Sequence, residues 1–367
     1  MLAKEELQRL SIIVKKLKNN QFNRDFFCNN PYGFLTDWGI TPVMGLFDPL
    51  ENLNNSLLRF LENDFEQTIL SVDYLYTKKS FDHSPYVDMD TLLLCNGSKK
   101  GVRLCVSEMQ LASIIRLCAE NNLFYLFSPY KMSICTDVGK NGYSNCIEQF
   151  FPLCDPNPGI LFVYISPEPQ ITTLLWFTEL LGLHRQFGRL LGYPECCISF
   201  YEKNIRLANE KHQGEFVSLM PTSQDFAYPF YTNNLLRYFG IHLISHFPCN
   251  YHCRPSIEIG MENYRGLLAS QPDYMKQVKK SLQTTVLYSD TQGVFILKEA
   301  YWDSDHSIKY RTENILSTIK ENKIFRILTS SDRILINDGR INMYNGVQYK
   351  GELPHVVKIL RFTDPNY

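Results

Sequence analysis

Residues 192–197 read GYPECC and residues 248–256 read PCNYHCRPS, so four of the chain's eleven cysteines lie in two short clusters. Prolines in both clusters predict turns, and thiolates gathered in turns are the ligands that zinc ions and iron–sulfur clusters use. Other cysteines are dispersed, and Cys135, Cys146 and Cys154 are spaced too widely for a ferredoxin-like run. The clustering predicts a metal or redox site and indicates no particular reaction.

Each cysteine pair is predicted to lie at the start of a helix. Pro194 stands just before the first pair, and Pro255 stands just after the second. At a helix start, unpaired backbone N–H groups and the positive end of the helix dipole favour the thiolate form. Bringing the pairs together closes a loop of about fifty residues, which costs only a few kcal/mol. We therefore expect all four sulfurs to converge on one site.

A four-iron (4Fe-4S) cluster is the predicted cofactor, with Cys196, Cys197, Cys249 and Cys253 as its ligands. Adjacent side chains diverge, so a vicinal pair fits separate irons of a cluster more easily than one zinc ion. Zinc is the alternative, with His246 available as a ligand in a mixed set with Cys197, Cys249 and Cys253. A redox-active dithiol and simple packing of buried thiols also remain open.

Three charged residues beside the cysteines are the predicted catalytic residues: Glu195, Arg254 and Arg185. Glu195 adjoins the first pair, and Arg254 lies at a helix start, where it can hold the carboxylate or phosphate of a small anionic substrate. Arg185 and Arg189 are four residues apart on one predicted helix face and can act in the same way. Alternatively, Glu195 complements a helix dipole and the two arginines belong to a solvated face.

Composition limits the classes of partner. The chain of 367 residues is 44% hydrophobic and 20% charged, with a formal net charge of −1. Such a small net charge predicts no general attraction to nucleic acid or to an anionic membrane. No apolar run reaches the roughly 18 residues that a membrane span needs, and no secretory signal opens the sequence. We expect a cytoplasmic protein with a small-molecule substrate and, for a redox cluster, an electron-donor protein.

Several common catalytic motifs are missing from the sequence. It has no phosphate-binding glycine loop, no dinucleotide fingerprint, no nucleophile elbow and no HExxH pair. This removes the commonest motifs of nucleotide hydrolases, dehydrogenases, serine hydrolases and metalloproteases.

The periodicity predicts an α/β (α+β) fold in three parts: a mixed sheet-and-helix domain over residues 1–169, a helical cysteine module over 170–283 and a β-rich domain over 284–367. Residues 129–159 are predicted to form a long loop. The predicted helices cover residues 2–18, 57–63, 111–121, 171–191, 196–212, 228–238, 255–270 and 272–283. The predicted strands cover residues 67–76, 101–105, 123–127, 160–165, 242–247, 284–288, 294–300, 325–328, 333–336, 340–344 and 356–362.

The stretch LLGYPECC over residues 190–197, followed by HFPC over 246–249 and CRPS over 253–256, resembles an uncharacterised family of prokaryotic proteins, a domain of unknown function. The resemblance covers about residues 180–270. It implies that both cysteine clusters belong to one module, and it supplies no activity.

Three functions follow as hypotheses. The first is a cytosolic metalloenzyme whose iron–sulfur cluster acts on a small substrate by redox or Lewis-acid chemistry. The second is a recognition or scaffold protein, in which zinc fastens two helices and the β-rich part binds a partner. The third is a thiol redox protein that uses the vicinal cysteine pair.

Overall fold

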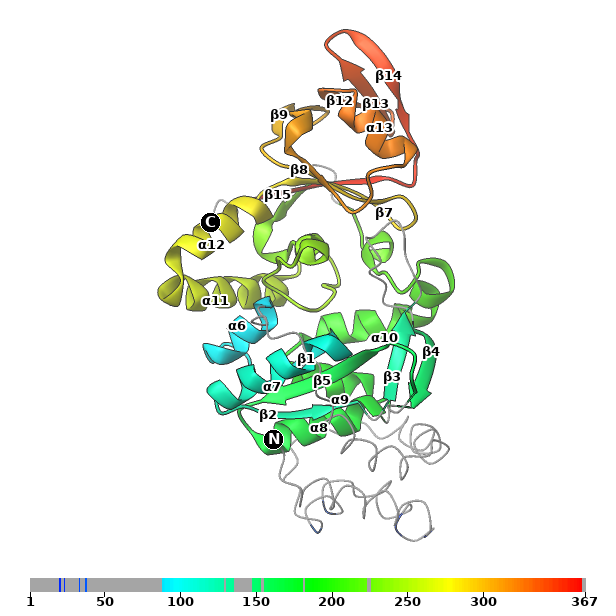
Figure 1. Ribbon diagram of the computed structural model, residues 1–367. Coiled ribbons are helices and arrows are strands. Elements are labelled where there is room, and N and C mark those ends of the chain that lie inside the picture. Colours follow the sequence, from blue (N-terminus) through cyan, green and yellow to red (C-terminus); the bar gives the residue numbers. More distant parts are fainter. Residues whose placement is uncertain are drawn as a thin grey trace. The chain divides into compact units, whose positions relative to one another are not determined.

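The computed structural model describes residues 88–364 apart from residues 129, 135–146, 153–154, 181 and 223–225, together with four isolated residues nearer the N-terminus. Within this part the fold is mixed α/β, as predicted, with eight α-helices and fifteen strands in three sheets (Figure 1). The predicted elements over residues 2–18, 57–63 and 67–76 lie outside it.

The chain divides into two compact units. One comprises residues 1–133 and 147–202, and the other comprises residues 134–146 and 203–367. The division falls inside helix α10 (Glu195–Lys211). The three-part domain organisation with a boundary near residue 283 stays a prediction.

A five-stranded sheet forms the centre of the first unit. Strand β5 pairs with β1, β2 and β3, and β3 pairs in turn with β4. β1 and β2 both run antiparallel to β5, so they are parallel to each other with β5 between them. Helix α7 connects β1 to β2, which confirms the predicted strand–helix–strand succession. The strands are β1 (Val102–Ser107), β2 (Phe124–Phe127), β3 (Tyr130–Ile134), β4 (Ile147–Pro152) and β5 (Ile160–Ser166).

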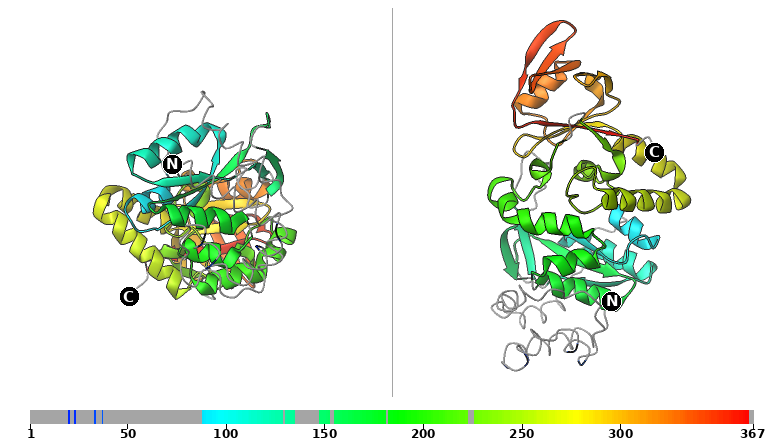
Figure 2. Two further views of the ribbon diagram at one scale, coloured as in Figure 1. Left: turned by 90° about the horizontal axis from the view of Figure 1, so that it is seen from below. Right: turned by 180° about the vertical axis from the view of Figure 1, so that it is seen from behind.

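Helices cover both faces of this sheet (Figures 1 and 2). On one face, α7 (Leu111–Glu120) and α6 (Met89–Cys95) bury apolar side chains against alternate residues of β1, β2 and β5. On the other face lie α8 (Pro169–Leu180) and α9 (His184–Leu190), where the ring of Phe187 lies 6.5 Å from that of Tyr164. The apolar residues of β5 thus pack against helices on both faces of the sheet, as a continuous apolar run predicts.

Two predictions in this unit are wrong. The predicted loop over residues 129–159 contains strands β3 and β4, and the apolar–polar alternation of β3 (YKMSI) was the sequence signal that the prediction missed. The single helix predicted over residues 171–191 is broken into α8 and α9 at Gly182, which has a φ of +66°. The N–H of Gly182 bonds to the carbonyl of Glu179, and that of Leu183 to the carbonyl of Thr178, so a glycine C-cap ends α8.

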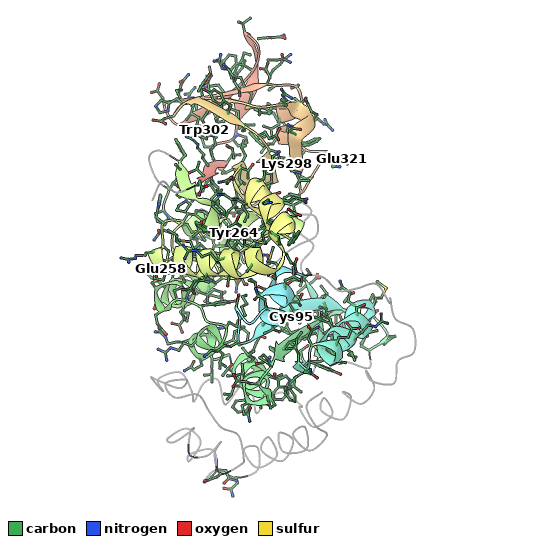
Figure 3. The ribbon with its side chains drawn as sticks, turned by 90° about the vertical axis from the view of Figure 1, so that its left-hand side faces the viewer. Cys95, Glu258, Tyr264, Lys298, Trp302 and Glu321 are labelled. Carbon is green, nitrogen blue, oxygen red and sulfur yellow. The ribbon has the colours of Figure 1, made fainter. Side chains whose placement is uncertain are left out.

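The second unit continues with α11 (Arg254–Ser270) and α12 (Pro272–Leu282), both close to their predicted bounds. Tyr264, labelled in Figure 3, packs its ring edge-on against Phe230 at 5.9 Å. α11 approaches this segment closely: a Cβ on Gly260 would lie 2.6 Å from the carbonyl oxygen of Tyr231. Only glycine permits that approach.

The segment before α11 differs from its prediction. The helix predicted over residues 228–238 is a short strand, β6 (Ala227–Pro229), followed by two 3₁₀ turns, Phe230–Thr232 and Leu235–Phe239. The strand predicted over residues 242–247 is irregular backbone. Asn233 and Asn234 interrupt the helix because their side-chain amides bond to distant carbonyls.

Two five-stranded sheets complete the second unit. One has the order β11-β8-β7-β15-β6, the other β14-β13-β12-β10-β9, and both contribute to one apolar core with α13. The elements are β7 (Thr285–Ser289), β8 (Gly293–Leu297), β9 (Tyr301–Ser304), β10 (Ser307–Lys309), β11 (Ile315–Ser317), α13 (Lys323–Thr329), β12 (Arg333–Asn337), β13 (Arg340–Asn345), β14 (Gln348–Leu353) and β15 (Lys358–Thr363).

The predicted predominance of strands after residue 283 is confirmed, although strands β9, β10, β11 and β14 were not predicted and one predicted strand is wrong. Residues 325–328, predicted as a strand, belong to helix α13. The side chain of Asn322 accepts a hydrogen bond from the N–H of Phe325 at 2.8 Å and caps the helix. Ile324 and Leu328 are four residues apart and both buried, so they form the apolar face of this short helix.

Candidate metal centre

The first cysteine pair lies in the first turn of α10, just after a glycine turn. Gly192 has a φ of +75°, and the N–H of Tyr193 bonds to the carbonyl of Gly188, which ends α9. The carbonyl of Pro194 then accepts the N–H groups of Cys197 and Ile198, each at 2.9 Å, as α10 begins. The predicted helix start is confirmed.

Within this pair the two sulfurs differ in exposure. Cys196 is exposed, whereas Cys197 is only 2% exposed. Their Sγ atoms are 3.9 Å apart. The vicinal side chains therefore do not diverge here, contrary to the assumption behind the iron–sulfur prediction.

The second pair is shaped by Asn250. Its side-chain oxygen accepts the N–H of His252 at 2.9 Å, and its carbonyl accepts the N–H of Cys253 at 3.1 Å. Cys253 is the N-cap residue of α11, and its carbonyl accepts the N–H of Ile257 at 2.9 Å. Cys249 is half-buried and Cys253 is 4% exposed. This asparagine turn brings the two cysteines to one end of the helix.

Buried polar side chains hold the irregular loop that carries the second pair. Asn234 donates to the carbonyl of His246 at 3.3 Å and accepts from the hydroxyl of Tyr251 at the same distance. Asn263 of α11 donates to the carbonyl of Leu243 at 2.7 Å. Residues 241–252 contain no helix or strand, so side chains satisfy the backbone instead. The repeated asparagines were the sequence signal for this support, and sequence reasoning missed it.

The four cysteines form one cluster. The Sγ atoms of Cys196, Cys197, Cys249 and Cys253 all lie within 4.8 Å of one another. None of the four forms a disulfide, and neither does any other cysteine that the structure describes. Soft sulfur ligands at this separation can hold a metal, so the predicted convergence of the two pairs is confirmed.

His246, the alternative ligand, lies in a different environment. Its Nε2 atom is 2.8 Å from the hydroxyl of Ser256, and both residues are buried. The group of close ligand atoms in the described part of the chain consists of the four cysteines. Ligation by His246 stays a prediction.

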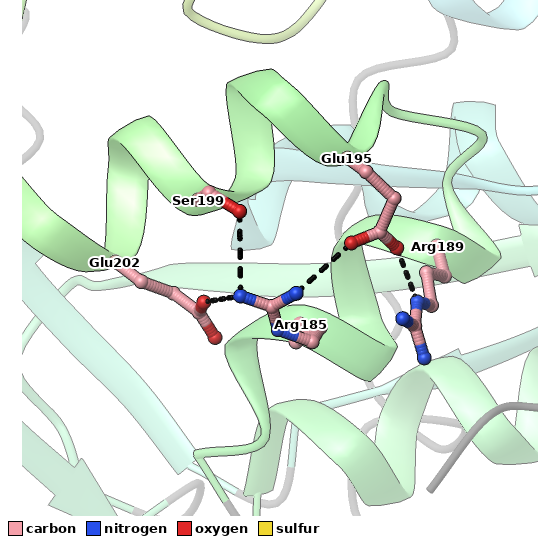
Figure 4. A network of polar contacts seen from close by, with 5 residues as sticks. All are labelled: Arg185, Arg189, Glu195, Ser199 and Glu202. Carbon is pink, nitrogen blue, oxygen red and sulfur yellow. Dashed lines mark hydrogen bonds and ion pairs between the residues drawn. The ribbon is translucent and has the colours of Figure 1, made fainter. Parts of the chain in front are cut away.

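The predicted catalytic residues Arg185 and Glu195 bind each other. One nitrogen of Arg185 is 3.0 Å from a carboxylate oxygen of Glu195, and the other is 2.5 Å from Glu202 (Figure 4). Arg189 pairs with the second oxygen of Glu195. The hydrogen bond to Glu202 and the neighbouring carboxylates raise the pKa of Arg185. Two guanidinium groups thus face two carboxylates, and the cluster balances its own charge.

Arg254, the third predicted catalytic residue, extends into solvent. Its side chain is 89% exposed, and its Nε lies 2.9 Å from Glu258, which is one turn along α11 and is labelled in Figure 3. Such an exposed pair contributes little to stability. The catalytic roles of Glu195, Arg254 and Arg185 stay predictions.

Comparison with known proteins places both cysteine pairs in one family segment. Residues 165–280 match the family described as a protein of unknown function, DUF483. No curated protein matches the chain, and no solved structure matches it. The segment covers 165–280 and so contains all four cysteines, as the resemblance implied. Among the described residues, no helix has the length and apolar character to cross a membrane.

Proposed function

We propose that the four cysteines bind a single zinc ion and that the protein is a zinc-stabilised binding protein. The spacing of the sulfurs carries this proposal. A tetrahedral zinc ion with zinc–sulfur bonds of about 2.3 Å holds its ligands about 3.8 Å apart. The Sγ atoms of Cys196 and Cys197 are 3.9 Å apart, and all four sulfurs lie within 4.8 Å.

A four-iron cluster fits this spacing less well. Each thiolate of such a cluster binds a different iron, so the separation of the irons adds to the distance between the ligand sulfurs. The sulfurs of a cubane therefore lie farther apart than those of one ion. The proximity of the vicinal pair favours one ion for both.

The set of four thiolate ligands also indicates the role of the zinc ion. A site with four protein ligands has no open position for substrate, and such sites stabilise structure rather than catalyse. Here the ion would join the start of α10 to the start of α11, where helix dipoles offset the thiolate charge. The irregular loop over residues 241–252, which has no ladder of backbone hydrogen bonds, would gain most from this ion.

Metal analysis of the full-length protein tests the proposal. We expect colourless protein with one zinc per chain, and Cys253→Ser should lose most of the zinc. Cys118→Ser is the matched control, since Cys118 is buried outside the cluster. Cys95→Ser serves the same purpose for an exposed thiol. One zinc per chain in Cys253→Ser would overturn the assignment.

An iron–sulfur enzyme is the second candidate, and the exposure of Cys196 favours it. An exposed ligand can be exchanged for substrate, and the iron it leaves could then act as a Lewis acid. Anaerobic purification decides between the two functions. Brown protein with equal amounts of iron and inorganic sulfide would establish the cluster and exclude zinc as the native metal. If neither preparation contains metal, the remaining function is that of a thiol redox protein that uses the vicinal cysteine pair.

A further inference from the structure

A cavity of about 310 Å³ lies in the second unit, away from the cysteines in sequence. Its wall comes from three segments: residues 283–285 at the start of β7, 300–302 at the start of β9 and 361–364 at the end of β15. This volume is at the lower end of the roughly 300–1,000 Å³ that ligand pockets span. The cavity therefore suits a small ligand and not a dinucleotide.

Aromatic side chains line the cavity. The indole N–H of Trp302 donates to the hydroxyl of Thr285 at 2.7 Å, which fixes the orientation of the ring. Phe226 supports the ring at a centroid distance of 6.3 Å. Tyr301, next to it, is 65% exposed, although tyrosine usually buries much of its ring. The guanidinium of Arg361 lies over the ring of Trp302 (Figure 3), so the exposed ring of Tyr301 is the surface on which a planar group can stack.

Arg361 provides a cation without a carboxylate partner. Its guanidinium carbon lies 5.3 Å from the centroid of Trp302, and it forms no ion pair with any residue that the structure describes. The other charged residue of the wall, Asp364, is paired with Lys279 at 2.6 Å. The carboxylate is thus neutralised and the guanidinium is not, so the cavity has an excess of positive charge beside its aromatic rings.

We propose that this cavity binds a nucleoside monophosphate. Arg361 would hold the phosphate by paired hydrogen bonds, and the base would stack on the ring of Tyr301. A neutral sugar would use the rings but leave the guanidinium without a counter-charge. The wall contains none of the four cysteines, although the ring of Phe362 in the wall packs against Tyr251 of the cysteine loop at a centroid distance of 5.1 Å.

Fluorescence titration of the full-length protein with the monophosphates of adenosine, guanosine, cytidine and uridine tests this inference. We expect saturable quenching by at least one of them, and adenosine and ribose 5-phosphate should bind more weakly than the complete nucleotide. Trp176 is 2% exposed and reports little on an external ligand. Calorimetry gives the same affinity without depending on tryptophan.

Substitution of Arg361 tests whether its guanidinium binds the phosphate. Arg361→Gln should weaken binding about tenfold or more, because a hydrogen bond to a charged group is lost, whereas Arg361→Lys should retain part of it. Arg340→Gln is the matched control, since Arg340 is an exposed arginine on β13, far from the cavity wall in sequence. Absence of binding by all four monophosphates would overturn the inference. Unchanged affinity in Arg361→Gln, or tighter binding of a single-stranded oligonucleotide than of any monophosphate, would do the same.

Discussion

The loop that carries Cys249 and Cys253 and the two sheets of the β-rich part are stabilised by different means. The loop has no regular hydrogen-bond ladder and relies on Asn234, Asn263 and the turn at Asn250. The sheets pair strand to strand and share a core of aliphatic side chains. In the loop, specific polar contacts fix the backbone while Leu243, Ile244 and Tyr251 are buried, whereas in the sheets the strand ladders and apolar contacts do both. Loss of one contact in the loop should therefore disturb the loop and leave the two sheets folded.

The largest effect should follow metal removal. Stripping the metal with a strong chelator removes a binding free energy that for structural zinc reaches about 10–16 kcal/mol. Hydrogen exchange should rise sharply over residues 241–253, while the amides of β12 and β13 keep their protection. Equal loss of protection in both regions would show that the loop and the sheets unfold as one.

Leu328→Ala should destabilise the sheets instead. Leu328 of α13 is fully buried in the core between the two sheets, and truncating such a leucine costs about 2–5 kcal/mol. Urea unfolding followed by circular dichroism measures the loss. Metal content should stay at the wild-type value, and a fall in bound metal would contradict the separation of the two regions.

Asn234→Ala tests the polar support of the loop. The substitution leaves the carbonyl of His246 and the hydroxyl of Tyr251 without this partner, and a buried group left unsatisfied costs about 1–3 kcal/mol. Competition with a chelator should show weaker metal binding. Asn345→Ala, which removes an exposed amide bonded to the carbonyl of Ser330, is the control and should bind metal normally.

Acid should weaken the sheets slightly through Asp303. The Ser307 hydroxyl, with Lys309 and Arg333, lowers the pKa of Asp303 from 3.8 to about 2. A lowered carboxyl pKa adds stability above its unfolded value, and this stability is lost as the pH falls from about 4 to about 2. Asp303→Asn should remove this part of the acid dependence in thermal unfolding scans. An identical pH profile in the variant would contradict it.

These two regions also differ in how far the sequence predicted them. Five of the nine strands described after residue 283 (β7, β8, β12, β13 and β15) have alternating or continuous apolar patterns and were predicted, whereas the four others were not. Helix α13 was predicted as a strand because so short an apolar segment does not distinguish the helical period from the strand period. The four ligands were found because cysteines cluster visibly. The loop's backbone was not predicted, since residues 242–247 are apolar like a strand while long-range bonds to asparagine side chains fix their path. Such bonds leave no periodic signal.

Strand β6 has a consequence for how this chain can be divided or recombined. It lies ahead of the cysteine loop in sequence, yet it pairs in parallel with β15, the last strand, through residues 227–229 and 361–363. A fragment that begins near residue 283 lacks β6 and presents the edge of β15 to solvent, where unpaired backbone groups invite association with other chains. Exchange of the C-terminal sheets between relatives would therefore have to carry this tripeptide along, so the two segments are expected to change together in evolution.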